Sequence, residues 1–202
     1  MKFLPLAIPE VVLVEPDVYR DDRGFFLETY QKLKYGAAGL PEEFVQDNHS
    51  FSIRGTLRGM HTQVRRPQGK LLRVVAGEIF DVAVDLRPGS PTFGQWVGEV
   101  LSAENFRQLW VPPGFAHGFC VMSESAHVLY KCTTFYEKDD EIALLWNDPA
   151  IGISWPTETP LLRPRDLAAP KLADILHKLV PYWGKSPRDP RQALALSRHP
   201  PG

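Results

Sequence analysis

The chain has 202 residues, 44% of them hydrophobic, and a formal net charge of −1. Such a length supports one sizeable core, so we expect a single domain. The near-neutral charge gives no general reason to bind nucleic acid or an anionic membrane. Two cysteines make no disulfide framework, no apolar run approaches membrane-spanning length, and the first residues lack the features of a signal peptide. We therefore expect a cytoplasmic protein.

Prolines and glycines, 19 and 15 in number, separate short runs rich in Val, Ile, Phe, Tyr and Trp. This punctuation is typical of an all-β fold. The extended segments that we expect are residues 11–14, 25–30, 44–51, 57–63, 78–87, 94–101, 108–111, 118–122, 127–136 and 141–146.

Helices are expected to be few, short and peripheral. One is predicted at residues 31–38, and the main one is C-terminal, where Leu172, Ile175, Leu176 and Leu179 have helical spacing after Pro170. Residues 1–184 should form the domain. The Pro- and Arg-rich residues 185–202 are interpreted as a loosely held C-terminal extension.

Alternation along the predicted strands brings polar side chains to shared faces. Gln46 and Asn48 lie on one face of residues 44–51. The face of residues 57–63 that holds His61 also holds Leu57, Gly59 and Gln63, and Thr62 points away from it. Residues 127–136 place two phenols, Tyr130 and Tyr136, on one face. These faces predict a cavity lined by polar groups.

The segment from Gly55 to Gly77 resembles the first motif of the cupin family of small β-barrels, which is Gly, five residues, His-x-His, three or four residues, Glu, six residues, Gly. The second cupin motif, Pro-x-Gly-x-x-His, is matched by PPGFAH, which ends at His117. Here Gln63 stands at the second histidine and Lys70 near the glutamate. A protonated lysine has no lone pair for a metal. The resemblance implies a cupin-type β-barrel or jelly roll, with its metal lost.

A fixed positive charge beside a histidine suits the removal of a proton next to a carbonyl group, because negative charge develops on the carbonyl oxygen. Lys70 can supply that charge and His61 can be the base, since the unperturbed pKa of histidine is near ~6.5. Protonation on the opposite face then needs a separate acid. Tyr130 is the candidate.

The motifs DDRGFF, FVQDNHS, LRGMH, LWVPPGFAHGF, LYKCT and RDLAAP, in this order, resemble the dTDP-4-dehydrorhamnose 3,5-epimerase family between residues 8 and 170. The resemblance implies an isomerase without metal or organic cofactor that converts dTDP-4-dehydro-6-deoxy-D-glucose into dTDP-4-dehydro-L-rhamnose through an enolate. It implies that His61 is the base, that Asp166 forms a dyad with it, that Tyr130 is the proton donor and that Lys70 stabilises the enolate.

The resemblance also implies a substrate-binding set. Arg23 and Arg58 resemble phosphate-contacting arginines, and His117 is placed in the same pocket. The positions that resemble those around the base, sugar and phosphates are Phe26, Glu28, Gln46, Asn48, Tyr136 and Glu141. A homodimer is implied, with residues near the amino terminus reaching across it. One departure from the family pattern is Thr62, which stands where an aromatic residue is usual.

Structural interpretations of the same residues, without a role in catalysis, stay open. Asp166 can be a solvated loop residue or a partner of Arg165, and Tyr130 and Tyr136 can be core aromatics. Rival functions are an epimerase acting at C3 or C5 alone, a metal-dependent cupin enzyme that uses His61, His117 and a substituted third ligand, and a barrel that binds nucleotide sugars without catalysis.

Overall fold

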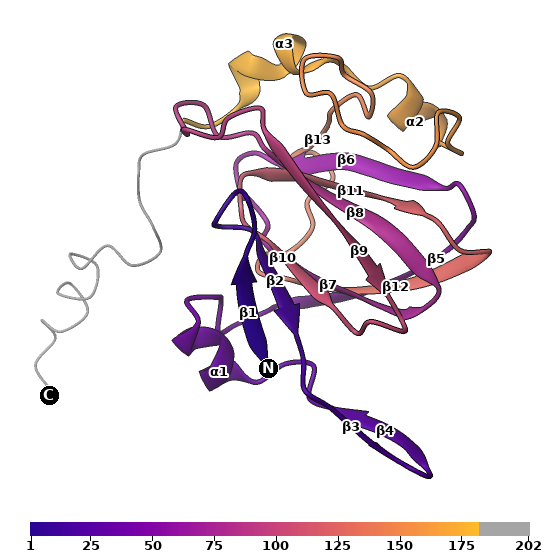
Figure 1. Ribbon diagram of the computed structural model, residues 1–202. Coiled ribbons are helices and arrows are strands. Elements are labelled where there is room, and N and C mark those ends of the chain that lie inside the picture. The colour runs from indigo at the N-terminus through magenta and orange to yellow at the C-terminus, as the bar shows by residue number, and fades with distance from the viewer. Residues whose placement is uncertain (182–202) are drawn as a thin grey trace, which may run out of the picture.

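The computed structural model describes residues 1–181. Two antiparallel sheets face each other, and a separate hairpin projects away from them (Figure 1). The six-stranded sheet has the order β1 (Lys2–Pro5), β2 (Val12–Glu15), β10 (Gln108–Val111), β7 (Lys70–Ala76), β12 (Ser125–Cys132) and β5 (Gln46–Ile53). The five-stranded sheet has the order β13 (Glu141–Ala143), β6 (Leu57–Gln63), β11 (Phe115–Val121), β8 (Glu78–Asp85) and β9 (Trp96–Ser102). The projecting hairpin is β3 (Val18–Asp21) and β4 (Gly24–Leu27).

The predicted all-β fold is confirmed in its jelly-roll form. Within residues 1–181, no strand pairing joins the two large sheets into a closed barrel. The main core lies between the sheets, where Leu72 and Val128 of one sheet pack with Ile79 and Phe119 of the other. These side chains are almost fully buried, which makes this layer the main source of hydrophobic stabilisation.

The outer face of the five-stranded sheet is covered by the C-terminal part of the described chain. This part contains α2 (Pro164–Leu167), α3 (Leu172–Ile175) and a 3-10 turn, Leu176–Lys178 (Figure 1). Leu172 and Ile175 pack there on Met60, Val82 and Leu144 in a second core. Burial on both faces explains why every residue of β8 after Glu78 except Phe80 is buried.

Several predicted boundaries differ from the observed ones. The strands β1, β3 and β7 were not among the predicted segments, and the strand expected at residues 127–136 ends at Cys132. The C-terminal helix is present but is only one turn long before it tightens into the 3-10 turn. Helix α1 (Lys32–Ala37) is the longest α-helix of residues 1–181, with six residues. The predicted extension, residues 185–202, and the end of the predicted domain lie outside the described residues.

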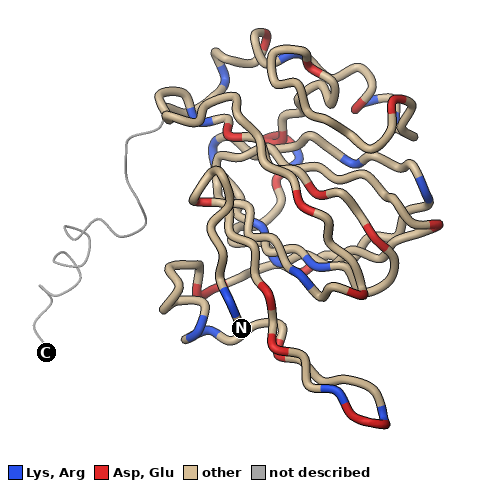
Figure 2. Tube along the Cα trace, viewed as in Figure 1, with Lys and Arg blue, Asp and Glu red and all other residues tan. Residues whose placement is uncertain are grey.

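Basic and acidic residues are interspersed over both sheets and the hairpin (Figure 2). This distribution fits the net charge of −1 and leaves anion recognition to local groups. None of the helices found in residues 1–181 has the length and apolar character that crossing a membrane would require.

Candidate functional site

A cavity of about 590 Å³ lies between the two sheets, beside the segment that leads into α2. Both sheets contribute to its wall. Ten of the residues singled out in the sequence line it: Gln46, Asn48, Arg58, His61, Lys70, His117, Tyr130, Tyr136, Glu141 and Asp166. The cavity is therefore the candidate active site.

The position of His61 depends on an irregularity in β6. Relative to β11, β6 carries one extra residue, because His61 pairs with His117 whereas Arg58 pairs with Phe119. Simple alternation, which placed Gly59 on the face of His61 and Arg58 on the other, is therefore wrong here. The bulge lets both Arg58 and His61 line the cavity.

Glycine is required at the bulge. Gly59 has a φ of 138°, and a Cβ atom there would lie 2.5 Å from the Cα atom of Gly118 on the neighbouring strand. No other residue fits both this backbone conformation and this close approach. The Arg-Gly-Met-His run thus has a structural reason for its glycine.

His61 and Asp166 form the expected dyad. The Nε2 atom of His61 lies 2.8 Å from Oδ1 of Asp166, and the aspartate is only 2% exposed. Asp166 belongs to α2, which begins with Pro164 and follows the extended residue Arg163. Burial alone would raise the pKa of Asp166, but its hydrogen bonds to His61 and Arg163 and their charges hold that pKa below the usual value. Asp166 is thus a carboxylate.

Arg163 was not among the predicted site residues. Its Nε atom donates to both carboxylate oxygens of Asp166, at 3.0 and 2.9 Å, and its Nη2 atom lies 3.1 Å from Nε2 of His61. The competing interpretation, in which Arg165 pairs with Asp166, is wrong, because Arg165 forms an ion pair with Glu141 at 2.7 Å. The only sequence signal for Arg163 was its position three residues before the aspartate.

His117 is held by a second buried carboxylate. Its Nε2 atom lies 2.9 Å from Oδ2 of Asp81, a residue of β8 with no exposed surface. Burial lowers the pKa of His117, and Asp81 only partly opposes this effect. A neutral imidazole that is anchored in this way can present a fixed polar edge to a ligand.

Lys70 and Tyr130 reach the cavity from the six-stranded sheet, opposite His61 and His117. Burial lowers the pKa of Lys70, whose Nζ atom makes no hydrogen bond within residues 1–181, and it raises the pKa of Tyr130. At neutral pH Tyr130 is therefore a phenol that can donate a proton. His61 and Tyr130 stand on opposite walls of the cavity, an arrangement that suits removal and return of a proton on opposite faces of a substrate.

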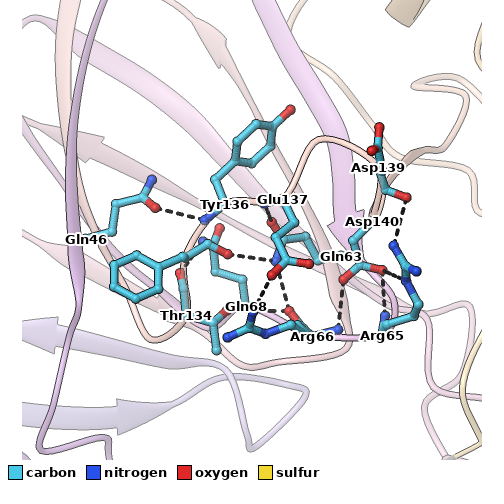
Figure 3. Close-up of polar contacts among 11 residues, drawn as sticks. Gln46, Gln63, Arg65, Arg66, Gln68, Thr134, Tyr136, Glu137, Asp139 and Asp140 are labelled. Carbon is cyan, nitrogen blue, oxygen red and sulfur yellow. Dashed lines mark hydrogen bonds and ion pairs between the residues drawn. The ribbon is translucent and has the colours of Figure 1, made fainter.

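Tyr136 reaches the cavity from a loop instead of from a strand. Because β12 ends at Cys132, the alternation that placed Tyr136 with Tyr130 does not apply. The loop is held instead by the side chains of Gln63 and Gln68, which donate to its carbonyl groups, and by that of Gln46, which accepts from the Tyr136 amide (Figure 3). Gln63 and Gln68 are wall residues that the site prediction omitted. Thr62, expected to point away from His61, also forms part of the wall.

Three predicted binding residues do not join this cavity. Arg23, Phe26 and Glu28 lie on or next to the projecting hairpin (Figure 1). The side chain of Arg23 is 89% exposed and pairs with Asp21, Phe26 is 71% exposed, and Glu28 pairs with Lys34. Within this chain these residues are thus separate from the cavity.

The cavity does not have the donor set of a metal centre. Residues 1–181 contain no cluster of three or more His, Cys, Asp or Glu side chains suited to a metal ion. The carboxamide of Gln63, which stands at the position of one cupin metal ligand, is used by the neighbouring loop. Lys70 stands near the position of another, and a protonated lysine has no lone pair for a metal. These residues do not fit the metal-dependent alternative.

Comparison with known proteins gives a consistent result. The family model described as dTDP-4-dehydrorhamnose 3,5-epimerase matches residues 5–174. The enzyme of that name from Pseudomonas aeruginosa is 58% identical over 176 residues, which cover 86% of this chain and 97% of the relative.

Solved structures agree with this result. The dTDP-6-deoxy-D-glucose-3,5-epimerase of Legionella pneumophila, in complex with dTDP-4-keto-L-rhamnose, has 49% identity and a TM-score of 0.87, covering 90% of this chain and 98% of that one. A 3'-monoepimerase from Streptomyces bikiniensis, in complex with dTDP-quinovose, has 33% identity and a TM-score of 0.84, covering 96% and 99%. This chain belongs to the dTDP-4-dehydrorhamnose 3,5-epimerase family.

Proposed function

We propose that the cavity between the sheets carries out the family reaction with His61 as the base, Asp166 as its partner, Lys70 as the stabilising cation and Tyr130 as the proton donor. The reaction is epimerisation at C3 and C5 of dTDP-4-dehydro-6-deoxy-D-glucose, which gives dTDP-4-dehydro-L-rhamnose. One observation supports these roles most strongly. His61, bonded to Asp166 of α2, stands on the five-stranded sheet, and Lys70 and Tyr130 stand on the six-stranded sheet across the same cavity.

The 4-keto group makes the chemistry possible, because it acidifies the C–H bonds at C3 and C5. If Nε2 of His61 carries a proton donated to Asp166, the lone pair of the ring is on Nδ1, and that atom takes the proton from carbon. The C–H electron pair becomes a double bond between that carbon and C4, and the π electrons of the C4 carbonyl move onto its oxygen, which gives the enolate. The ammonium of Lys70 opposes this negative charge, and the hydroxyl of Tyr130 returns a proton to the opposite face.

The close rival is epimerisation at a single carbon. The Streptomyces bikiniensis relative, a 3'-monoepimerase, has the same fold at 33% identity, so the fold alone does not distinguish the two reactions. Tyr130 does not distinguish them either, because inversion at one carbon also needs a donor on the face opposite the base. The 58% identity to the Pseudomonas aeruginosa enzyme named a 3,5-epimerase supports double inversion.

Mass spectrometry of the product formed in deuterated water tests the proposal. Chelator-treated enzyme is incubated with dTDP-4-dehydro-6-deoxy-D-glucose. Incorporation of two deuterons, at C3 and C5, is the expected result. One deuteron would indicate the single-carbon rival. No deuteron, together with tight binding of the dTDP-sugar, would overturn the assignment in favour of binding without catalysis, and activity that returns only with added metal would favour the metal-dependent reading.

The proposal includes a homodimer in which the β3–β4 hairpin completes the site of a partner subunit. Its support is the projection of the hairpin from the sheets and the exposure of Tyr19, Phe25 and Phe26 on it (Figure 1). Isolated surface aromatics are common, but three on one short hairpin are typical of a contact surface. The cytoplasmic location expected from the sequence stays a prediction.

A further inference from the structure

Two glutamine side chains hold three consecutive residues of the loop after β12 (Figure 3). Gln63 Nε2 donates to the Phe135 carbonyl at 3.2 Å, and Gln63 Oε1 accepts from the Glu137 amide at 2.8 Å. Between them, the amide of Tyr136 donates to Oε1 of Gln46 at 2.9 Å. These contacts supply the main-chain partners that a continued strand would have supplied.

The carboxamide of Gln63 has all its donors in use. The side chain is 5% exposed, and its Nε2 atom also donates to the carbonyl of Arg66 at 2.9 Å. A buried amide with this many partners fixes the geometry of each of them, because breaking one contact leaves a buried polar group unpaired. The loop therefore has one favoured position relative to β6.

The side chain of Tyr136 has no comparable anchor. It is 47% exposed, lines the cavity, and its hydroxyl makes no hydrogen bond within residues 1–181. The direction of its ring is therefore set by the main chain of residues 135–137. The position of that main chain is fixed by the hydrogen bonds of Gln63 to the residues before and after Tyr136. Gln63 belongs to the same strand as His61.

We propose that Gln63, at the position of a metal ligand in the cupin motif, is a positioning residue that acts through Tyr136 on the binding of the dTDP-sugar. This inference rests on the proposed function only in that Tyr136 contacts the substrate. Gln63 has no part in proton transfer. Loss of its donors should therefore weaken substrate binding while the chemical step continues.

The test is a double-mutant cycle on KM and kcat with Gln63→Glu and Tyr136→Ala. Gln63→Glu keeps the acceptor for the Glu137 amide but loses the donors to residues 66 and 135. We expect each single variant to raise KM about tenfold with kcat within about twofold of the parent. The double variant should have the KM of the worse single variant, because both changes remove the same interaction.

A matched control comes from the same loop. Arg66 and Glu137 form an ion pair through exposed side chains outside the cavity, so Arg66→Gln removes a loop contact without touching the main chain of Tyr136. The KM of Arg66→Gln should match that of the parent enzyme. Gln63→Asn keeps the carboxamide but shortens the side chain, and it replaces Gln63→Glu in the cycle if thermal melting shows that the glutamate variant does not fold.

Two outcomes would overturn the inference while the epimerase assignment stands. The first is a double variant whose increase in KM equals the product of the increases caused by Gln63→Glu and by Tyr136→Ala. The second is a KM effect of Gln63→Glu when Tyr136→Ala has none. Failure of the proposed function would be recognised separately, as a parent enzyme that incorporates no deuterium.

Discussion

The Nε2 atom of His61 lies 2.8 Å from the Oδ1 atom of Asp166, on an aspartate that is almost completely buried. A buried carboxylate with a lowered pKa fixes the tautomer of its imidazole partner, so that the opposite nitrogen of the ring holds the lone pair. In the proposed mechanism, the carboxylate of Asp166 would also stabilise the imidazolium that forms when His61 takes a proton. The relationship therefore supports the proposal that His61 is the base and that Asp166 has an electrostatic role.

Replacement of His61 by asparagine should remove exchange at both carbons. The amide has no basic nitrogen, and general base catalysis typically contributes about 10²–10⁴-fold. We expect incorporation of deuterium at C3 and C5 to fall together by at least about 10²-fold, with the affinity for dTDP unchanged in calorimetry. Exchange that persists at one carbon would mean that another residue is the base for that carbon.

Replacement of Arg163 should move the acid limb of the pH profile of kcat/KM. Although burial raises the pKa of Asp166, the hydrogen bonds and charges of His61 and Arg163 hold that pKa below the usual value. Without the guanidinium, the pKa of Asp166 rises, and the dyad loses its carboxylate at a higher pH. We expect the acid limb of Arg163→Gln to lie at higher pH than that of the parent.

Arg163→Lys, which keeps a positive charge, should restore most of the parent profile. Arg163 is half-exposed, so solvent screening keeps the displacement modest. A loss of kcat at all pH values without displacement of the limb would indicate that Arg163 only holds α2 in place.

The sequence predicted much of this site because period-2 alternation and short motifs survive in regular strands. His61 and Tyr130 lie on predicted strands and line the cavity as expected, whereas Lys70 and His117, which also line it, were placed by the short motifs alone. The failures have local physical causes. The bulge at Gly59 reverses the side to which Arg58 points. The pattern of hydrophobic residues does not indicate that β6 has one extra residue relative to its neighbour. Arg163 was missed because its contact with His61 joins residues that are 102 positions apart in the sequence.

The position of the hairpin residues relative to the site could not be predicted from the sequence for a different reason. Arg23 and Phe26 belong to the motif that resembles the family, yet they lie outside the cavity of this chain. The sequence of one chain does not indicate whether a projecting hairpin contacts another chain. The dimer proposal explains their position, and it makes a prediction that does not depend on any pattern in the sequence.

Hybrid dimers should recover activity from two inactive variants. If the hairpin completes the partner's site, a mixed dimer of His61→Asn with Arg23→Ala/Phe26→Ala has one site with both defects and one with none. After the two variants are unfolded and refolded together in equal amounts, activity should return to about a quarter of the parent value. Activity that stays at the level of the separate variants, with dimers verified by light scattering, would contradict the exchange of hairpins.

The stability of the fold should decrease on mild acidification because of His117. Burial lowers the pKa of this histidine, and the charges of Lys70 and His61 add to the effect, although Asp81 opposes it. Between the lowered pKa and the ordinary value near ~6.5, the unfolded chain binds a proton that the folded chain does not. The contribution of His117 to the free energy of unfolding is therefore complete above about pH 6.5 and is lost as the pH falls through the lowered pKa.

Urea unfolding at about pH 7.5 and about pH 5.5 measures this effect. His117→Gln should show a smaller loss of the free energy of unfolding between the two pH values than the parent, even though it is less stable at both, because Asp81 loses its partner. His177→Gln is the matched control, since His177 is exposed and its replacement should leave the loss as it is in the parent. An equal loss in the parent and in His117→Gln would show that His117 is protonated as readily in the folded chain as in the unfolded one.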